Sequence, residues 1–113
     1  MNGKFHVGDS YILLYTYKKN PASSALSWNI HFWLGSETSL DESGIAAYKS
    51  VELDDQLGGA AVQYRETQGS ESSLFLSYFK QLGLGVEYLP GGMESGFAHV
   101  IFIFITRCRV FSL

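Results

Sequence analysis

Two β-prone segments separated by a short polar loop constrain the fold more than any other feature of the sequence. Residues 27–34 alternate, with Trp28, Ile30, Phe32 and Leu34 on one side of an extended chain and Ser27, Asn29, His31 and Trp33 on the other. Residues 10–17 are rich in aromatic and β-branched side chains throughout, which indicates a strand covered on both faces. The loop between the segments contains Pro21. Together they predict two neighbouring strands that can form a hairpin.

A long helix is predicted after the second strand. Ser39 and Glu42 have the spacing of a capping box, and Gly58-Gly59 should end the helix near Leu57. Two apolar stripes result, one of Ala46, Leu53 and Leu57 and one of Leu40, Ala47 and Val51, with Tyr48 on the border of the second. The helix is either lodged deeply in its own domain or offers one stripe to a partner. Periodicity alone favours the first interpretation.

The remaining segments predict a mixture of strands and helices. Residues 61–66 are typical of a short strand, and Ser70 is expected to cap a shorter helix that runs to about Lys80. Residues 97–113 are strongly β-prone. This mixture indicates an α/β or α+β layered structure, and a length of 113 residues fits one domain.

Composition excludes several classes of function. The net charge of −3 provides no basic surplus for a phosphate backbone, which argues against nucleic acid as a partner. A single cysteine, Cys108, indicates a reduced, cytosolic protein without an internal disulfide. The longest apolar run, residues 100–105, is far shorter than the roughly 20 residues of a membrane-spanning helix. We therefore expect no transmembrane segment, and we find no secretory signal at the start of the sequence.

The residues that could perform catalysis do not form a catalytic pattern. None of His6, His31 and His99 has a metal-ligand spacing such as H-E-x-x-H. The adjacent acids Asp41-Glu42 and Asp54-Asp55 point about 100° apart on a helix, so neither pair converges on one bond. The sequence therefore predicts a protein that is not an enzyme.

Several motifs follow one another in an order and spacing that resemble a gelsolin-family domain. They are Gly8-Asp9-Ser10-Tyr11-Ile12, Ile30-His31-Phe32-Trp33-Leu34-Gly35, Asp41-Glu42-Ser43-Gly44, Val51-Glu52-Leu53-Asp54-Asp55, Gln63-Tyr64-Arg65-Glu66, Glu71-Ser72, Tyr78-Phe79-Lys80 and Gly91-Gly92 through Gly96-Phe97. The resemblance covers roughly residues 3–100 and is greatest to the first domain of severin, fragmin, villin and gelsolin. It implies an α+β fold in which a mixed β-sheet is sandwiched between one long and one short helix. It divides the chain into a gelsolin-like domain, residues 1–100, and a hydrophobic divergent C-terminal tail, residues 101–113.

This resemblance implies a calcium-dependent module that binds monomeric actin or caps filament barbed ends in the cytoplasm and cytoskeleton. In the family, the long helix of the first domain inserts into a cleft between two actin subdomains, so the second interpretation of the wide apolar arc becomes the favoured one. The positions that match family contacts to actin are Tyr48 and Phe97, surrounded by Gly44, Ala47 and Val51.

The resemblance also implies two calcium sites. An internal site matches the carbonyls of Gly8 and Met93 and the carboxylates of Asp9 and Glu42. A second site, shared with an actin carboxylate, matches the Asp54 carboxylate and the carbonyls of Gly59 and Ala61. These are the hard oxygen ligands that calcium prefers. Taken alone, Asp9 could be a turn residue, Glu42 could complete the capping box and Asp54 could be a solvated helix residue.

The sequence departs from the family pattern in three places. Family first domains have a strand before the Gly8-Asp9 loop, and we expect this chain to lack it and to expose a sheet edge. Residues 81–90 lack the lysines that family members have near the double glycine, which argues against phosphoinositide binding. Residues 101–113 either replace the last strand of the sheet or form a non-family tail, and we favour the tail. The alternative function is therefore a truncated gelsolin-like fragment or interaction scaffold without actin activity of its own.

Overall fold

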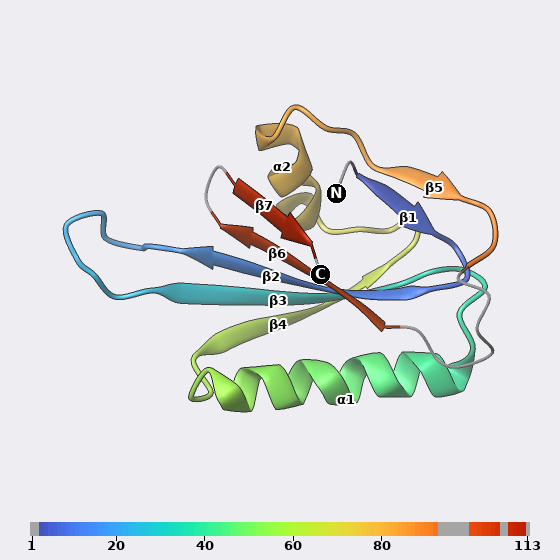
Figure 1. Cartoon of the computed structure of the whole chain (residues 1–113), viewed down its shortest axis with the longest axis horizontal. Coiled ribbons are helices and arrows are strands. Elements are labelled where there is room, and N and C mark those ends of the chain that lie inside the picture. The colour runs from blue at the N-terminus through green and yellow to red at the C-terminus, as the bar shows by residue number, and fades with distance from the viewer. Residues whose placement is uncertain (1–2, 93–99, 107–108, 113) are drawn as a thin grey trace.

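A central five-stranded sheet lies between two helices in the computed structural model, which describes residues 3–92, 100–106 and 109–112 (Figure 1). The long helix α1 (Leu40–Gln56) covers one face of the sheet, and the short helix α2 (Ser73–Gln81) covers the other. The strands are β1 (Lys4–His6), β2 (Ser10–Tyr17), β3 (Ser27–Leu34), β4 (Ala61–Thr67), β5 (Glu87–Leu89), β6 (Val100–Thr106) and β7 (Arg109–Ser112). The α+β fold with a mixed sheet between a long and a short helix is as predicted.

The strand order in the central sheet is β4-β3-β2-β6-β7. The predicted hairpin is confirmed, because β2 and β3 pair antiparallel from Ser10↔Leu34 to Tyr17↔Ser27. β4 lies parallel to β3, and β6 lies parallel to β2. Parallel neighbours need a crossover connection, and α1 provides the one between β3 and β4. The sheet therefore combines a local hairpin with pairings between distant segments.

Helix α1 begins and ends where the sequence predicts. Oγ of Ser39 accepts a hydrogen bond from the Glu42 backbone N–H at 3.2 Å and donates one to Oε1 of Glu42 at 3.3 Å. At the other end, Gly58 and Gly59 have φ values of 74° and 73°, a backbone region that glycine enters without steric cost. The Ser39 cap and the glycine stop therefore fix the length of the helix.

The predicted cap of the short helix was wrong by two residues. Ser72, not Ser70, is the N-cap of α2, and its Oγ accepts a hydrogen bond from the Phe75 backbone N–H at 3.2 Å. The Ser72 hydroxyl also donates to Oε2 of Glu66 at 2.8 Å. A tertiary contact with a buried carboxylate therefore selects between two serines that both have cap propensity.

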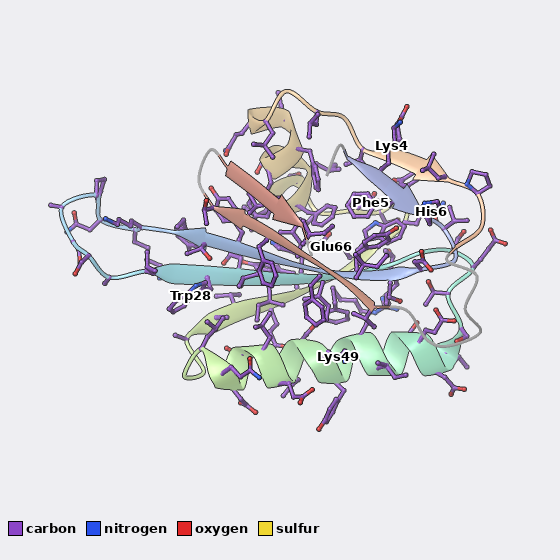
Figure 2. The ribbon with its side chains drawn as sticks, in the orientation of Figure 1. Lys4, Phe5, His6, Trp28, Lys49 and Glu66 are labelled. Carbon is purple, nitrogen blue, oxygen red and sulfur yellow. The ribbon has the colours of Figure 1, made fainter. Side chains whose placement is uncertain are left out.

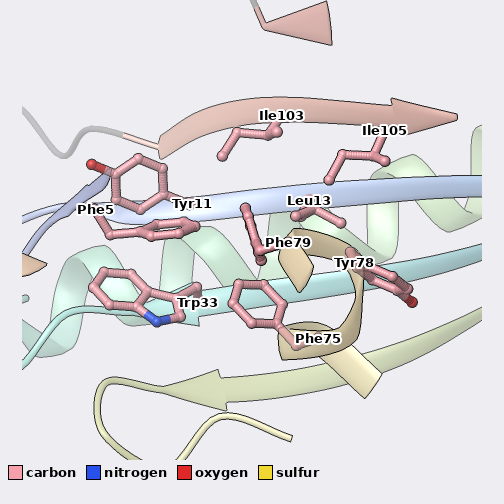
Figure 3. Close-up of a cluster of buried hydrophobic side chains, with 9 residues drawn as sticks. All are labelled: Phe5, Tyr11, Leu13, Trp33, Phe75, Tyr78, Phe79, Ile103 and Ile105. Carbon is pink, nitrogen blue, oxygen red and sulfur yellow. The ribbon is translucent and has the colours of Figure 1, made fainter. Parts of the chain in front are cut away.

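Two hydrophobic clusters fill the layers on either side of the sheet. The cluster on the α2 side is strongly aromatic and consists of Phe5, Tyr11, Leu13, Trp33, Phe75, Tyr78, Phe79, Ile103 and Ile105 (Figure 3). The cluster on the α1 side centres on Ile12, Leu14 and Ile30, with Leu53 of α1 and its C-cap residue Leu57 packed against it. The strand β2 contributes to both, as expected for a segment predicted to be covered on both faces.

The expectation that no strand precedes the Gly8-Asp9 loop was wrong. The strand β1 is present and pairs in parallel with β5, from Lys4↔Glu87 to His6↔Leu89. Its central side chain, Phe5, has no exposed surface and touches the rings of Tyr11, Trp33, Phe75 and Phe79. Three residues suffice for this strand because Phe5 anchors it to the aromatic cluster.

The C-terminal segment pairs in the central sheet. β6 lies beside β2 over seven residue pairs, and β7 lies antiparallel to β6. Ile103 and Ile105 are each 2% exposed and belong to the aromatic cluster. These residues therefore act as a strand of the sheet, which is the interpretation that we did not favour from the sequence. The division of the chain at residue 100 stays a prediction, because strand pairing does not reveal which residues the relatives share.

Candidate functional site

The outer face of α1 carries apolar side chains that the domain does not cover. Ala46 is fully buried beneath the helix, whereas Tyr48 is 66% and Val51 48% exposed. The predicted contact residues Gly44, Ala47, Tyr48 and Val51 follow the spacing i, i+3, i+4, i+7, so they share one face of the helix. We call these four residues the α1 outer stripe. Phe97, the fifth predicted contact, lies outside the described residues.

The outer stripe is fixed in place by the opposite side of the same helix. Leu53 and Leu57 pack against the cluster of Ile12, Leu14 and Ile30. Leu40, at the start of the helix, is 91% exposed and extends the apolar surface beyond the stripe. Figure 2 shows α1 with outward-pointing side chains on the side away from the sheet. A contiguous exposed apolar face on a rigid helix is typical of an interaction surface.

Two of the predicted internal calcium ligands, Gly8 and Asp9, lie where three segments of the chain meet. The Asp9 backbone carbonyl accepts hydrogen bonds from the Gly35 N–H at 3.2 Å and the Thr38 hydroxyl at 2.8 Å. The Gly8 N–H donates to the Gly91 carbonyl at 2.8 Å. The turn of residues 8–9 is thereby tied to the segment that leads into α1 and to the double glycine. Glu42 is in the first turn of that helix.

The close approach of the double glycine to Asp9 depends on the missing side chains of glycine. Asp9 is 2% exposed, and a Cβ placed on Gly92 would stand 2.7 Å from its Oδ1 atom. A Cβ on Gly8 would stand 3.0 Å from the Gly91 carbonyl oxygen. Only glycine lets these backbones meet beside a buried carboxylate. A buried aspartate, backbone carbonyls and a glutamate at a helix start are oxygen donors that fit calcium. Met93 lies outside the described residues.

Asp54 lies beside the start of β4, as the second predicted ligand set requires. Its Oδ1 accepts a hydrogen bond from the Ala61 backbone N–H at 2.9 Å, and its Oδ2 accepts one from the Gln63 side-chain amide at 3.0 Å. The Asp54 backbone carbonyl accepts from the Gly59 N–H at 2.8 Å. Asp54, Gly59 and Ala61 are therefore brought together. The three lie together at the end of α1, where the Asp54 carboxylate faces N–H donors of the chain itself.

No cluster of three or more histidine, cysteine, aspartate or glutamate side chains occurs within the described ranges. Each predicted calcium set contains at most two carboxylates and otherwise uses backbone carbonyls, so it does not depend on such a cluster. Calcium ligation by these residues stays a prediction.

A buried polar network on the α2 side was not predicted from the sequence. Nδ1 of His31 lies 2.8 Å from Oε2 of Glu66, and Nε2 of His31 lies 2.8 Å from the Tyr78 hydroxyl. The Asn29 amide donates to that hydroxyl at 3.0 Å, and the Ser72 backbone N–H donates to Oε1 of Glu66. In Figure 2, Glu66 lies on the side of the sheet away from Lys49 of α1. The network joins β3, β4 and α2.

Burial determines the protonation of this network. Desolvation lowers the pKa of His31, although the hydrogen bond with Glu66 partly offsets the shift. Burial also raises the pKa of Tyr78 well above its ordinary range. At neutral pH, a neutral His31 therefore donates from Nδ1 to Glu66 and accepts from the Tyr78 hydroxyl at Nε2. Every member of the chain of hydrogen bonds then has a consistent role.

The fold, the α1 outer stripe and the buried network define an α+β domain with a partly uncovered helix on one face of its sheet. The family model for the gelsolin repeat matches residues 2–76. Cytoplasmic gelsolin of Homarus americanus is 63% identical over 98 residues, which are 87% of this chain and 12% of that protein. Gelsolin-like protein 1 of Lumbricus terrestris is 57% identical over 99 residues, which are 88% of this chain and 26% of that protein. The chain belongs to the gelsolin family.

A third relative has a name that states an activity. Actin depolymerising venom protein gelsolin 1 of Platymeris rhadamanthus is 53% identical over 97 residues, which are 86% of this chain and 25% of that protein. The chain thus spans about an eighth to a quarter of the length of these relatives. Neither α1 nor α2 is long and apolar enough to cross a membrane, and no other helix occurs in the described part of the chain.

Proposed function

We propose that this chain is an actin-binding module and that the α1 outer stripe is its contact surface. The observation that carries the proposal is the contrast within one helix: Ala46 is fully buried, while Tyr48 and Val51 on the other side are about half exposed or more. A helix anchored in this way can place an apolar face into a groove of a partner without rearranging. The names of the relatives, which include an actin-depolymerising protein, favour actin as that partner.

We further propose that binding depends on calcium. Asp9 and Glu42, with the Gly8 carbonyl, are the proposed internal ligands among the described residues, and Met93 is proposed from the resemblance alone. Asp54 with the carbonyls of Gly59 and Ala61 is the proposed shared set. Calcium, when bound, supplies a divalent charge that cross-links oxygen ligands from distant segments. Supporting this proposal, Asp9 is buried and tied through its carbonyl to Thr38, one turn before Glu42.

The proposed activity is binding rather than catalysis, and its proposed location is the cytoplasm and cytoskeleton. Because one such domain offers one helix face, we expect it to bind monomeric actin or to cap barbed ends and not to sever filaments. Phosphoinositide binding is not part of the proposal, because residues 81–90 contain no lysine.

The test is co-elution with monomeric actin in size-exclusion chromatography, first in calcium and then in chelator. We expect a one-to-one complex in calcium and a weaker or absent complex in chelator. A complex that is equally strong in chelator would remove the calcium part of the proposal. A monomeric chain that never shifts the elution of actin would contradict actin binding while leaving the fold intact.

A further inference from the structure

Three side chains tie the short strand β5 to the body of the domain. The Tyr88 hydroxyl donates to the carboxylate of Glu71, with distances of 2.9 Å to Oε1 and 2.8 Å to Oε2. The Trp33 indole N–H donates to the same carboxylate at 2.9 Å. The rings of Trp33 and Tyr88 are stacked with their centroids 6.2 Å apart. We call Trp33, Glu71 and Tyr88 the Tyr88 clamp.

The clamp lies at one end of a continuous run of contacts that leads to Asp9. The Leu89 carbonyl, next to Tyr88, accepts a hydrogen bond from the Val7 N–H at 2.9 Å. Two residues later, the Gly91 carbonyl accepts from the Gly8 N–H at 2.8 Å, and Gly92 then lies against the Asp9 carboxylate. Nothing but β1 pairs with β5 in the part of the chain that the structure describes. The clamp is therefore a main attachment of the segment that carries the double glycine.

A ligand set built from backbone groups needs the backbone to be held in place. A binding site loses affinity when its supporting residues let the ligand atoms move by about 1 Å from their correct positions. The two chain segments at the proposed internal site, residues 8–9 and 91–92, touch without any side chain of the glycines to lock them. Their relative position is therefore fixed by the hydrogen bond from the Gly8 N–H to the Gly91 carbonyl, by the β1–β5 pairing and by the clamp.

We propose that the Tyr88 clamp sets the calcium affinity of the internal site by holding Gly91 and Gly92 against Asp9. This inference rests on the calcium part of the proposed function. Tyr88, Glu71 and Trp33 are positioning residues, since none of them is a predicted ligand. Because coupling between two sites is reciprocal, calcium also tightens the attachment of β5.

The state of the Tyr88 hydroxyl is consistent with this role. Burial and the neighbouring Glu71 raise its pKa above the ordinary value, so the hydroxyl stays protonated and acts as the donor at neutral pH. The Tyr88 ring is 41% exposed, in contrast to the fully buried Trp33. Removing the hydroxyl therefore releases the tether without creating a cavity in the core.

The experiment compares Tyr88→Phe with Tyr17→Phe in the full chain without actin. Tyr17→Phe removes the same hydroxyl from the far end of β2, at the hairpin. Calcium chloride is titrated into each protein by calorimetry, and urea unfolding is measured in chelator. We expect Tyr88→Phe to weaken calcium binding by roughly five-fold or more and Tyr17→Phe to leave it unchanged. Glu71→Gln should weaken calcium binding as well. The double variant should lose less calcium affinity than the product of the two single effects, because both changes disrupt the same clamp.

Tryptophan emission, measured in a Trp28→Phe background so that it comes from Trp33, provides a second readout. Calcium should change the tryptophan fluorescence of this background protein, and the change should be reduced when Tyr88→Phe is added, because Trp33 is part of the clamp. A purely structural role would lower the urea midpoint in chelator and leave the calcium affinity unaltered.

Two outcomes separate this inference from the function on which it rests. Calcium binding of equal affinity in Tyr88→Phe and the unsubstituted protein would overturn the clamp and leave the calcium site standing. No calcium binding by the unsubstituted protein would overturn the calcium site and the clamp together.

Discussion

The two faces of the central sheet are built in different ways. On the α2 side, aromatic rings fill the layer, and the buried polar atoms of His31, Glu66 and Tyr78 bond to one another. On the α1 side, the buried cluster is three aliphatic residues of β2 and β3, and the covering helix leaves Tyr48 and Val51 exposed. The network on the α2 side satisfies its polar groups within the chain. Helix α1 leaves more apolar surface uncovered than α2, on which Leu74 and Leu76 are 37% and 40% exposed.

We propose that this difference reflects a division of roles between stability and binding. A chain of this size has little stability to spare, so a surface used for binding must be supported by a core elsewhere. The aromatic layer under α2 supplies that core. Substitutions on the two faces should therefore affect different measurements, and the following predictions test this from the largest expected effect to the smallest.

The largest effect is expected for Phe75→Ala on the α2 side. Phe75 is fully buried and contacts the rings of Phe5, His31 and Phe79. Its removal should lower the free energy of unfolding by about 3–5 kcal/mol, because the rigid surroundings cannot fill the cavity. Urea denaturation followed by circular dichroism measures this loss.

Val51→Ala on the outer stripe is the matched control on the α1 side. Its side chain is 48% exposed, so the loss of unfolding free energy should stay near about 0.5 kcal/mol. If Phe75→Ala prevents folding, Phe75→Leu should give a smaller loss in the same direction. Equal losses for the substitutions on the two faces would contradict the proposed division.

The second-largest loss of unfolding free energy is expected for Glu66→Ala. The carboxylate is 1% exposed and accepts hydrogen bonds from His31, from the Ser72 backbone and from the Ser72 hydroxyl. Leaving these buried donors without an acceptor should lower the free energy of unfolding by about 3 kcal/mol. Thermal or urea unfolding checks this, with the exposed Glu52→Ala on α1 as the control. A similar stability for both variants would show that the network contributes little.

Local sequence signals predicted the elements whose cause is local. The alternation of residues 27–34, the capping box at Ser39 and the glycines after Leu57 each act within a few residues, and each was found as predicted. The choice of Ser72 over Ser70 was missed, because it depends on Glu66 in the preceding strand. Strand β1 was missed since three residues carry no periodicity, and only its contact with the aromatic cluster stabilises it.

The candidate site shows the same limit. The wide apolar arc on α1 could be recognised from periodicity, although periodicity alone pointed to burial rather than to a partner. The Tyr88 clamp could not be recognised, because Glu71 precedes Tyr88 by 17 residues and follows Trp33 by 38. Contacts between residues so far apart in sequence follow from the topology, which no single segment encodes.

Tyr48→Ala on the outer stripe should weaken actin binding while leaving the fold intact. A 66% exposed tyrosine at the centre of the proposed docking helix is a candidate hot spot, so its loss should weaken actin binding by roughly 30-fold, or about 2 kcal/mol. The free energy of unfolding should change by no more than about 0.5 kcal/mol. Co-elution with monomeric actin measures the binding. Val62→Ala, which trims a 50% exposed apolar residue on β4, is the control and should bind like the unsubstituted chain.

The smallest change in the free energy of unfolding is expected from pH, and it should come from His31 on the α2 side. Burial lowers the pKa of His31 in the folded state below the value of about 6.5 typical of an unfolded chain. Above that pH, His31 is neutral in both the folded and the unfolded chain, so its protonation does not reduce the free energy of unfolding. As the pH falls below it, the unfolded chain takes up a proton first, so the free energy of unfolding should decrease by up to about 1.4 kcal/mol per pH unit.

Urea unfolding at pH 7, 6 and 5 measures this slope, and His31→Gln should make it shallower. The comparison must be made as a difference between the two proteins, because His6 and His99 remain in both. Equal slopes would mean that His31 accepts its proton as readily in the fold as in the unfolded chain, and hence that the α2 face tolerates a buried charge. The contrast between the two faces would then rest on the aromatic packing alone.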